Sequence, residues 1–410
     1  MKAVFVAFLL LLSNLGFCQS EISLEDVAKN VKESNFTVLE NAQRVYQAKE
    51  TINFNKRNLL PRLNLWNLLS TPFDWRGAIN IVQDIAPFLV PNNWFKLRQS
   101  EDFYLAYQEQ YRALWANEVM TAKLLFINAL RDQDFLKALK EQVAQMEDLI
   151  GIARSGQIFG ATDPRTVRFL EIRRLELQED ARKFETLLSE EKKAISYALG
   201  LQQEEEISLS KIPLPEVEEL EPLNYDTFIF RALDSSPELN QYDHLKEALY
   251  HTRKTIHFSF LGASQTSASI FTNIPVQDGL GFGAASSLRI SNSEDHILDI
   301  QKESTREVLK KNLYNLVSNF NSYVVNIENQ QKRRSLAQAN YESIRTQLAL
   351  GMSIDPLEML KSAENEFDAK VSLINYKYEV VNTMEKLKRM IFNEDYKKRE
   401  SKLQRLIEME

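Results

Sequence analysis

The chain has little of what closes and cross-links compact domains. Its one cysteine is Cys18, so no disulfide can form within the chain and no cluster of thiolates can hold a metal. It has eleven glycines in 410 residues, well under the average usage of about 7%. Because glycine is the usual residue of tight turns, this shortage indicates few turns and therefore long secondary-structure elements.

The sequence also lacks a basic excess and a long apolar run. The net charge is −7 with both signs interspersed, which excludes nucleic acid as an expected partner, because phosphate binding needs a basic stripe. Beyond the N-terminal segment no stretch reaches the roughly 18 apolar residues that a membrane-spanning helix needs. Any passage through a membrane would therefore be made by strands.

The residue patterns of common enzyme and cofactor sites are missing as well. No histidine belongs to the zinc-protease pattern and none has a cysteine companion; the four are His244, His251, His257 and His296. The spaced glycines over 279–283 are followed by neither a helix start nor a lysine, so they do not form a phosphate loop. No nucleophile elbow is present. We therefore expect no enzyme activity, no cofactor and no metal.

The first 18 residues have the layout of a secretory signal peptide. Lys2 precedes an apolar run from Ala3 to Leu12, and small residues lead to a cut before Gln19. The run is too short to span a bilayer as a mature helix. A second interpretation makes Cys18 a lipidated first residue, but the bulky Phe17 before it favours ordinary cleavage.

Two long segments, over about 95–154 and 296–350, have apolar residues spaced alternately three and four apart, the seam of a coiled coil. In the first segment the seam is Ala122, Leu125, Ala129, Asp132, Leu136, Leu139, Val143, Met146, Ile150 and Ala153. In the second it is Leu313, Leu316, Phe320, Tyr323, Ile327, Gln330, Arg334, Ala337, Tyr341, Ile344 and Leu348. The first helix would be roughly 90 Å long at 1.5 Å per residue, more than a compact globular core needs.

Each long segment ends in the same kind of turn and is followed by a second helical segment. Glycine supplies the left-handed backbone that closes a helix, and Asp-Pro caps and begins the next one. The turn residues are Gly156, Gly160, Asp163 and Pro164 in the first case, and Gly351, Asp355 and Pro356 in the second. Helical hairpins are therefore predicted over about 95–200 and 296–392. The two aspartates read as helix caps in preference to ion sites.

The two halves of the chain read as tandem repeats. Residues 24–61 and 225–262 align weakly at an offset of 201, and each half has the order helix, β-like stretch, long helix, turn, returning helix. The predicted organisation is a signal peptide over 1–18, a first repeat over 19–200, a linker over 201–224, a second repeat over 225–395 and a helical tail over 396–410.

The β-like stretches lie over about 61–91 and 262–291, and each is long enough for two strands of about ten residues. Four strands cannot close a barrel that excludes lipid from its edges. Either several chains share one barrel, or the strands stay in water. The expected fold class is mainly α with a small β part, built from two tandem repeats of a strand pair and a long coiled-coil hairpin.

Four short motifs, in this order and spacing, resemble those of the TolC, or outer-membrane efflux protein, family. They are Leu24–Ala28 at the start of the first helix, Leu59–Leu63 before the first strands, Ser236–Leu239 in the second repeat, and Gly351–Leu360 at the second turn. The resemblance covers nearly the whole mature chain.

This resemblance implies a homotrimer with a helical α-barrel and a shared twelve-stranded β-barrel, in the outer membrane and periplasm of a Gram-negative bacterium. It also implies that a periplasmic adaptor and an inner-membrane transporter dock at the helical tips, which are the two turns named above, Gly156–Pro164 and Gly351–Pro356. The chain departs from the family pattern where Gly262 stands in place of the proline that Pro61 supplies in the first repeat.

The function implied is a passive exit channel of a tripartite efflux or type I secretion system. The alternative is a periplasmic coiled-coil structural protein that kept the fold without a membrane barrel. The small and polar composition of the second β-like stretch favours this alternative.

Overall fold

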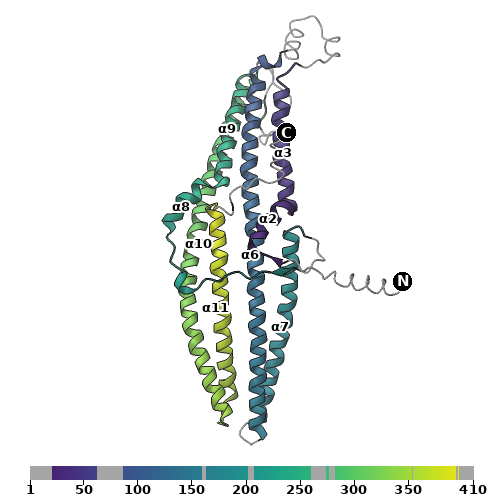
Figure 1. The fold of residues 1–410 in the computed structure, drawn as a ribbon. Coiled ribbons are helices and arrows are strands. Elements are labelled where there is room, and N and C mark those ends of the chain that lie inside the picture. Colours follow the sequence, from purple (N-terminus) through teal and green to yellow (C-terminus); the bar gives the residue numbers. More distant parts are fainter. Residues whose placement is uncertain are drawn as a thin grey trace, which may run out of the picture. The chain divides into compact units, whose positions relative to one another are not determined.

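The described part of the chain is almost entirely helical (Figure 1). The computed structural model describes residues 21–61, 86–158, 163–201, 207–259, 274–276, 282–352, 354–393 and 396. The helices are α2 (Leu24–Ser34), α3 (Phe36–Arg57), α6 (Pro91–Ile158), α7 (Pro164–Ala198), α8 (Tyr225–Asp234), α9 (Pro237–His257), α10 (Gly283–Ala349) and α11 (Pro356–Met390). Two short 3-10 helices, η1 (Pro87–Leu89) and η2 (Val217–Glu219), and two short strands, β1 (Glu21–Ile22) and β2 (Ser208–Leu209), complete it.

Contacts divide the chain into two units. Unit 1 comprises Met1–Asn35, Glu118–Tyr225 and Asn315–Lys388, and unit 2 comprises Phe36–Asn117, Asp226–Tyr314 and Arg389–Glu410. No helix among the described residues is both long and apolar enough to cross a membrane. The expected signal peptide over 1–18 lies outside the described residues, as does the expected tail over 396–410 apart from Tyr396.

The four long helices predicted from the heptad spacing are present, as α6, α7, α10 and α11. Two of them begin earlier than expected, α6 at Pro91 and α10 at Gly283. The first position of a helix suits proline because its fixed φ is helical and its missing N–H has no partner there anyway. The predicted pair of helical hairpins is therefore confirmed, with longer first helices.

One expectation for the second β-like stretch is wrong. Residues 283–291 were expected in a strand, but they form the first turns of α10. The Ser287 hydroxyl donates to the Gly283 carbonyl, and Arg253 of α9 donates to the side chain and the carbonyl of Ser291. Both serines are buried, so the small side chains serve close packing of helices. Similarly, 86–91 form η1 and the start of α6.

The remaining residues of the two β-like stretches, 62–85, 262–273 and 277–281, lie outside the described residues.

The core of unit 1 forms where the apolar seams of the two hairpins pack together. One cluster joins all four long helices: Leu136, Leu139, Met146, Leu149, Ile150, Ala153, Val167, Leu170, Leu177, Ala181, Tyr341, Ile344, Leu348, Met359 and Ala363. Most of these α6 and α10 positions are those of the predicted seams. Burying each large apolar side chain contributes roughly 1.5–3 kcal/mol, so this cluster fixes the lengthwise register of the helices.

The linker between the repeats packs across unit 1. Its side chains Val217, Leu220 and Leu223 lie on a second cluster formed by α10 and α11. Asn321 of α10 accepts from the Leu223 N–H at 2.8 Å and donates to the Leu223 carbonyl at 3.0 Å. The Asn321 amide thereby provides hydrogen-bond partners for both the N–H and the carbonyl of Leu223. An irregular linker needs such partners because it has no helix or sheet to supply them.

The N-terminal segment of unit 1 is fixed to the end of α7. β1 pairs in parallel with β2, with Glu21 opposite Ser208, and the Asn35 amide donates to the Ala198 carbonyl at 3.1 Å. Gly200 follows α7 with φ +67° and lies directly against Ser34 of α2.

We expect Gly200→Ala to lower the free energy of unfolding by about 2–3 kcal/mol. An added Cβ would lie 2.3 Å from the Ser34 carbonyl oxygen, and a left-handed backbone costs alanine a further roughly 1 kcal/mol. Gly351→Ala is the matched control, because Gly351 has φ +77° but no atom within 4 Å of an added Cβ. Its cost should stay near 1 kcal/mol. Thermal unfolding followed by circular dichroism measures both, and equal losses would contradict the role given to Ser34.

The core of unit 2 is smaller and joins α6, α9 and α10. Its buried members are Phe103, Ala106, Leu245, Ala248, Leu249, Ile256, Ile274 and Leu298. Asn92 of α6 donates to the Phe258 carbonyl just after α9 at 3.1 Å. The start of α6 is therefore tied to the end of α9.

Candidate functional site at the hairpin tips

The first tip is the turn between α6 and α7. Asp163 caps α7, its carboxylate accepting from the Arg165 N–H at 2.8 Å, and Pro164 takes the first helical position. Gly156 lies in the last turn of α6, which continues to Ile158. Gly160 lies outside the described residues. The cap and proline roles predicted for this turn are therefore present.

The second tip, between α10 and α11, closes in the same way. Gly351 donates to the Leu348 carbonyl at 3.0 Å and Met352 to the Gln347 carbonyl at 3.1 Å. This pair of bonds, with φ +77° at Gly351, is the usual glycine ending of a helix. Asp355 accepts from the Leu357 N–H at 3.0 Å, and Pro356 begins α11. Asp355 is therefore a helix cap like Asp163.

Both tips expose large apolar side chains, which the sequence analysis missed. Ile158 is 81% exposed at the end of α6, and Leu350, Leu357 and Met352 are 74%, 61% and 53% exposed around the second turn. Figure 1 shows that the C-terminal ends of α6 and α10 and the N-terminal ends of α7 and α11 lie at the same end of unit 1. Exposed apolar groups gathered in one place mark a contact surface for another molecule. The signal in the sequence was apolar residues placed directly beside the glycine and Asp-Pro signals.

Ion pairs hold the four helices together beside the tips. Arg345 of α10 pairs with Asp148 of α6 at 2.7 Å, and Arg173 of α7 pairs with Glu364 of α11 at 2.9 Å. Arg154 of α6 also pairs with α7, through Glu171. Exposed pairs of this kind each contribute about 0–1 kcal/mol. These pairs specify which helices lie next to each other, and they thereby hold the helix ends at the tips in a defined arrangement.

Both aspartates at the tips act as caps, and across the described ranges no three His, Cys, Asp or Glu side chains are placed to hold a metal.

Among the described residues, one histidine of unit 2 lies near a carboxylate. His251 Nε2 lies 3.6 Å from Asp102 Oδ2. Burial, and then the nearby Glu247, raise the pKa of Asp102 to about 6, and burial lowers the pKa of His251. Both shifts favour the neutral forms, so this contact reads as packing of two partly buried groups.

No protein-family model and no curated protein sequence matches the chain. Solved structures do match it. The outer-membrane channel OprN aligns with a TM-score of 0.72 at 10% identity, over 91% of this chain and 90% of that one. CusC, described with its transmembrane channel formation, aligns with a TM-score of 0.72 at 13% identity, over 90% and 91%. The Campylobacter jejuni outer-membrane channel CmeC aligns with a TM-score of 0.70 at 12% identity, over 94% and 88%.

These matches cover nearly the full length of both partners in each pair. At such low identity they establish the fold and leave the residues of the site to be argued from this chain. The chain has the fold of these outer-membrane channels, and its resemblance to the TolC family is confirmed at the level of the fold.

Proposed function

We propose that this protein is an outer-membrane channel of an efflux or secretion assembly, a passive exit duct across the periplasm and the outer membrane. The observation that carries the proposal is the fold, which is shared over about nine-tenths of the chain with outer-membrane channels. Transport through such a channel depends on pore shape, pore charge and opening, so it requires no bond-making residues.

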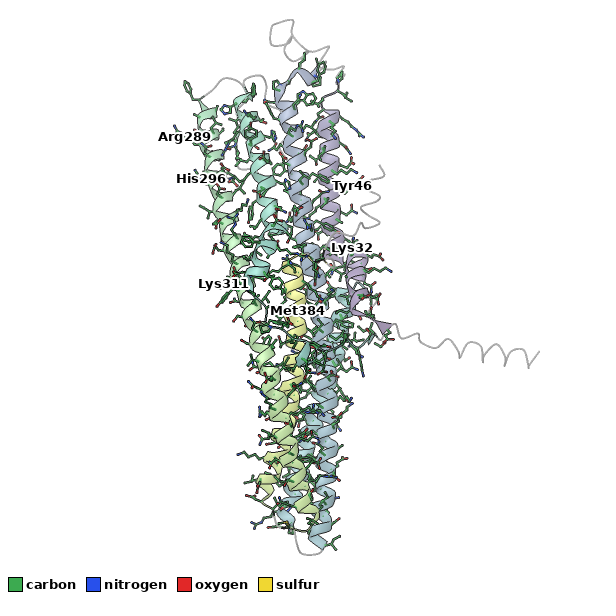
Figure 2. All side chains as sticks on the ribbon, turned by 60° about the vertical axis from the view of Figure 1, so that its left-hand side comes forward. Lys32, Tyr46, Arg289, His296, Lys311 and Met384 are labelled. Atoms are coloured by element: carbon green, nitrogen blue, oxygen red, sulfur yellow. The ribbon has the colours of Figure 1, made fainter. Side chains whose placement is uncertain are left out.

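The proposed assembly is a homotrimer, as the resemblance to the TolC family implies. Uncovered apolar residues on long helices of both units support association between copies. On α7 the exposed residues include Phe169, Ile172 and Leu175, and on α10 they include Ile297, Ile300 and Val308. Figure 2 shows Arg289, His296 and Lys311 along one side of the same α10, and all three are exposed. Large exposed apolar patches are uncommon on monomeric soluble proteins, and neighbouring copies would cover these residues.

The proposed partners are a periplasmic adaptor and an inner-membrane transporter, docked at the tips. The docking surface comprises the turn residues Gly156, Gly160, Asp163, Pro164, Gly351, Asp355 and Pro356 with the apolar side chains beside them. The Asp163 and Asp355 caps fix the first turns of α7 and α11 before any partner binds, so these turns lose little conformational freedom on docking.

Membrane fractionation of cells that express the full chain tests the proposal. We expect the protein in the outer membrane, as a species that runs as a trimer unheated and as a monomer after heating. A mass measurement of the purified assembly in detergent should give three chains. Release with the soluble periplasm would contradict the channel and would support the coiled-coil structural protein.

A further inference from the structure

The α6–α7 hairpin is joined by opposite charges at heptad intervals along α6. Arg154 pairs with Glu171, Glu147 with Arg174 and Lys140 with Glu185. The residue numbers of the partners increase along α7 as they decrease along α6, as expected for antiparallel helices. The same antiparallel register places Asp132 of α6 opposite Glu191 of α7, and Asp132 acts on the carboxyl group of Glu191. Two carboxyl groups therefore face each other at this level of the hairpin, whereas each of the three preceding contacts pairs a cation with a carboxylate.

Asp132 also occupies a seam position, where the heptad pattern calls for an apolar residue. It is only 4% exposed, and Arg131 Nε donates to its Oδ1 at 2.9 Å. Arg131 in turn lies 3.7 Å from Glu379 of α11. One guanidinium therefore contacts two carboxylates, Asp132 and Glu379.

Glu191 forms no ion pair with a described residue, although Arg131 opposes the rise of its pKa. Its Oε2 is buried and accepts no hydrogen bond from the described part of the chain. Two carboxylates cannot hydrogen-bond to each other, since neither has a proton to donate. A hydrogen bond forms only when one of them is protonated. Two buried carboxyls this close do not both ionise easily.

We propose that Asp132 and Glu191 bind one proton between them, and that this shared proton fastens the C-terminal part of α7 to α6. The proton is carried by Glu191, which donates to the Asp132 carboxylate, and on titration it passes to water. Among the described residues, the charged groups that act on Glu191 are Asp132 and Arg131 of α6, and Arg131 also lies near Glu379 of α11.

The pH range follows from the environment of Glu191. Burial, and then the charge of Asp132, raise the pKa of Glu191 from its ordinary 4.5 to about 7. Between these values the folded hairpin holds a proton that the unfolded chain lacks. The stabilisation is therefore fully present below about pH 4.5 and is lost as the pH rises through about 7. Above that range two negative charges repel each other across the hairpin.

Amide hydrogen exchange in α7 of the full-length protein in detergent tests the proposal. After correction for the intrinsic rate, exchange near Glu191 should be about tenfold faster at pH 8 than at pH 6; one pKa unit corresponds to tenfold, and partial exposure reduces the full shift. Glu191→Gln should remove this difference, because its amide donates to Asp132 at every pH. Glu190→Gln, an exposed neighbour, should behave as the wild type.

The infrared carbonyl band of a protonated carboxyl group gives a readout that does not depend on folding. The difference between wild type and Glu191→Gln at pH 6 should contain this band, and it should vanish near pH 8. Asp132→Asn should shift the titration of the band toward lower pH. If the difference spectrum at pH 6 has no such band, or if wild-type exchange is the same at both pH values, the shared proton does not exist.

Discussion

The double substitution Leu350→Asp and Leu357→Asp is expected to reduce adaptor-dependent export by at least about a hundredfold. Both side chains are largely exposed beside the second turn, so the substitutions remove no core contact. Apolar anchors at the centre of an interface each contribute about 2 kcal/mol or more, and 1.4 kcal/mol corresponds to a factor of ten in affinity. The added carboxylates would also lose their hydration at the docked surface.

The control for this prediction is the pair Gln338→Asp and Ala339→Asp. These residues also lie on α10 and are exposed, but they are not large apolar side chains and lie more than ten residues from the turn. The control should export normally, and both double variants should melt and assemble like the wild type. Deletion of residues 351–356 is the harsher form of the test and should also abolish export while leaving the trimer folded. Normal export by the tip variants would remove the docking role from this turn.

The hairpins were predictable because their signals are local. Seam spacing depends only on the period of the helix, and the Gly and Asp-Pro turns depend on the backbone preferences of single residues. The start of α10 was not predictable in this way. Its first turn contains small and polar residues that suit several structures, and the contact of Arg253 with Ser291 that accompanies the helix joins residues 38 positions apart.

The packing of a second face of α6 could not be predicted from the sequence, for a related reason. The apolar seam identifies one face of the helix, but α6 also packs on α11 through polar side chains. Lys123 contacts Glu385 at 3.0 Å, the Asn382 amide donates to Asn128 at 3.0 Å, and the Tyr378 hydroxyl donates to Asp134 at 2.7 Å. Along the sequence such residues are indistinguishable from a solvated helix face. Only the fold, which brings residues about 250 positions apart together, shows that they are partners.

The Lys123–Glu385 pair makes the other large expected effect. Their side chains are 6% and 3% exposed, and Lys388 donates to the second oxygen of Glu385 at 2.6 Å. Burial alone would raise the pKa of Glu385, but the two lysines hold it below its usual range. Lys123→Met is expected to lower the free energy of unfolding by about 3 kcal/mol, because the buried carboxylate of Glu385 then loses its buried cationic partner. The midpoint of thermal unfolding in detergent measures this loss.

The double variant Lys123→Met with Glu385→Leu should recover most of that loss, to within about 1 kcal/mol of the wild type, since two apolar side chains of similar volume need no partner in the buried interface. Lys388 can turn to water, as its side chain is 35% exposed. Lys140, which also lies on α6, forms an exposed pair with Glu185 of α7. Lys140→Met should therefore cost less than about 0.5 kcal/mol. If the double variant is as unstable as Lys123→Met, packing at this position matters and the charge pair does not. A recovered double variant means instead that the polar face of α6 specifies its partner helix more than it stabilises the bundle.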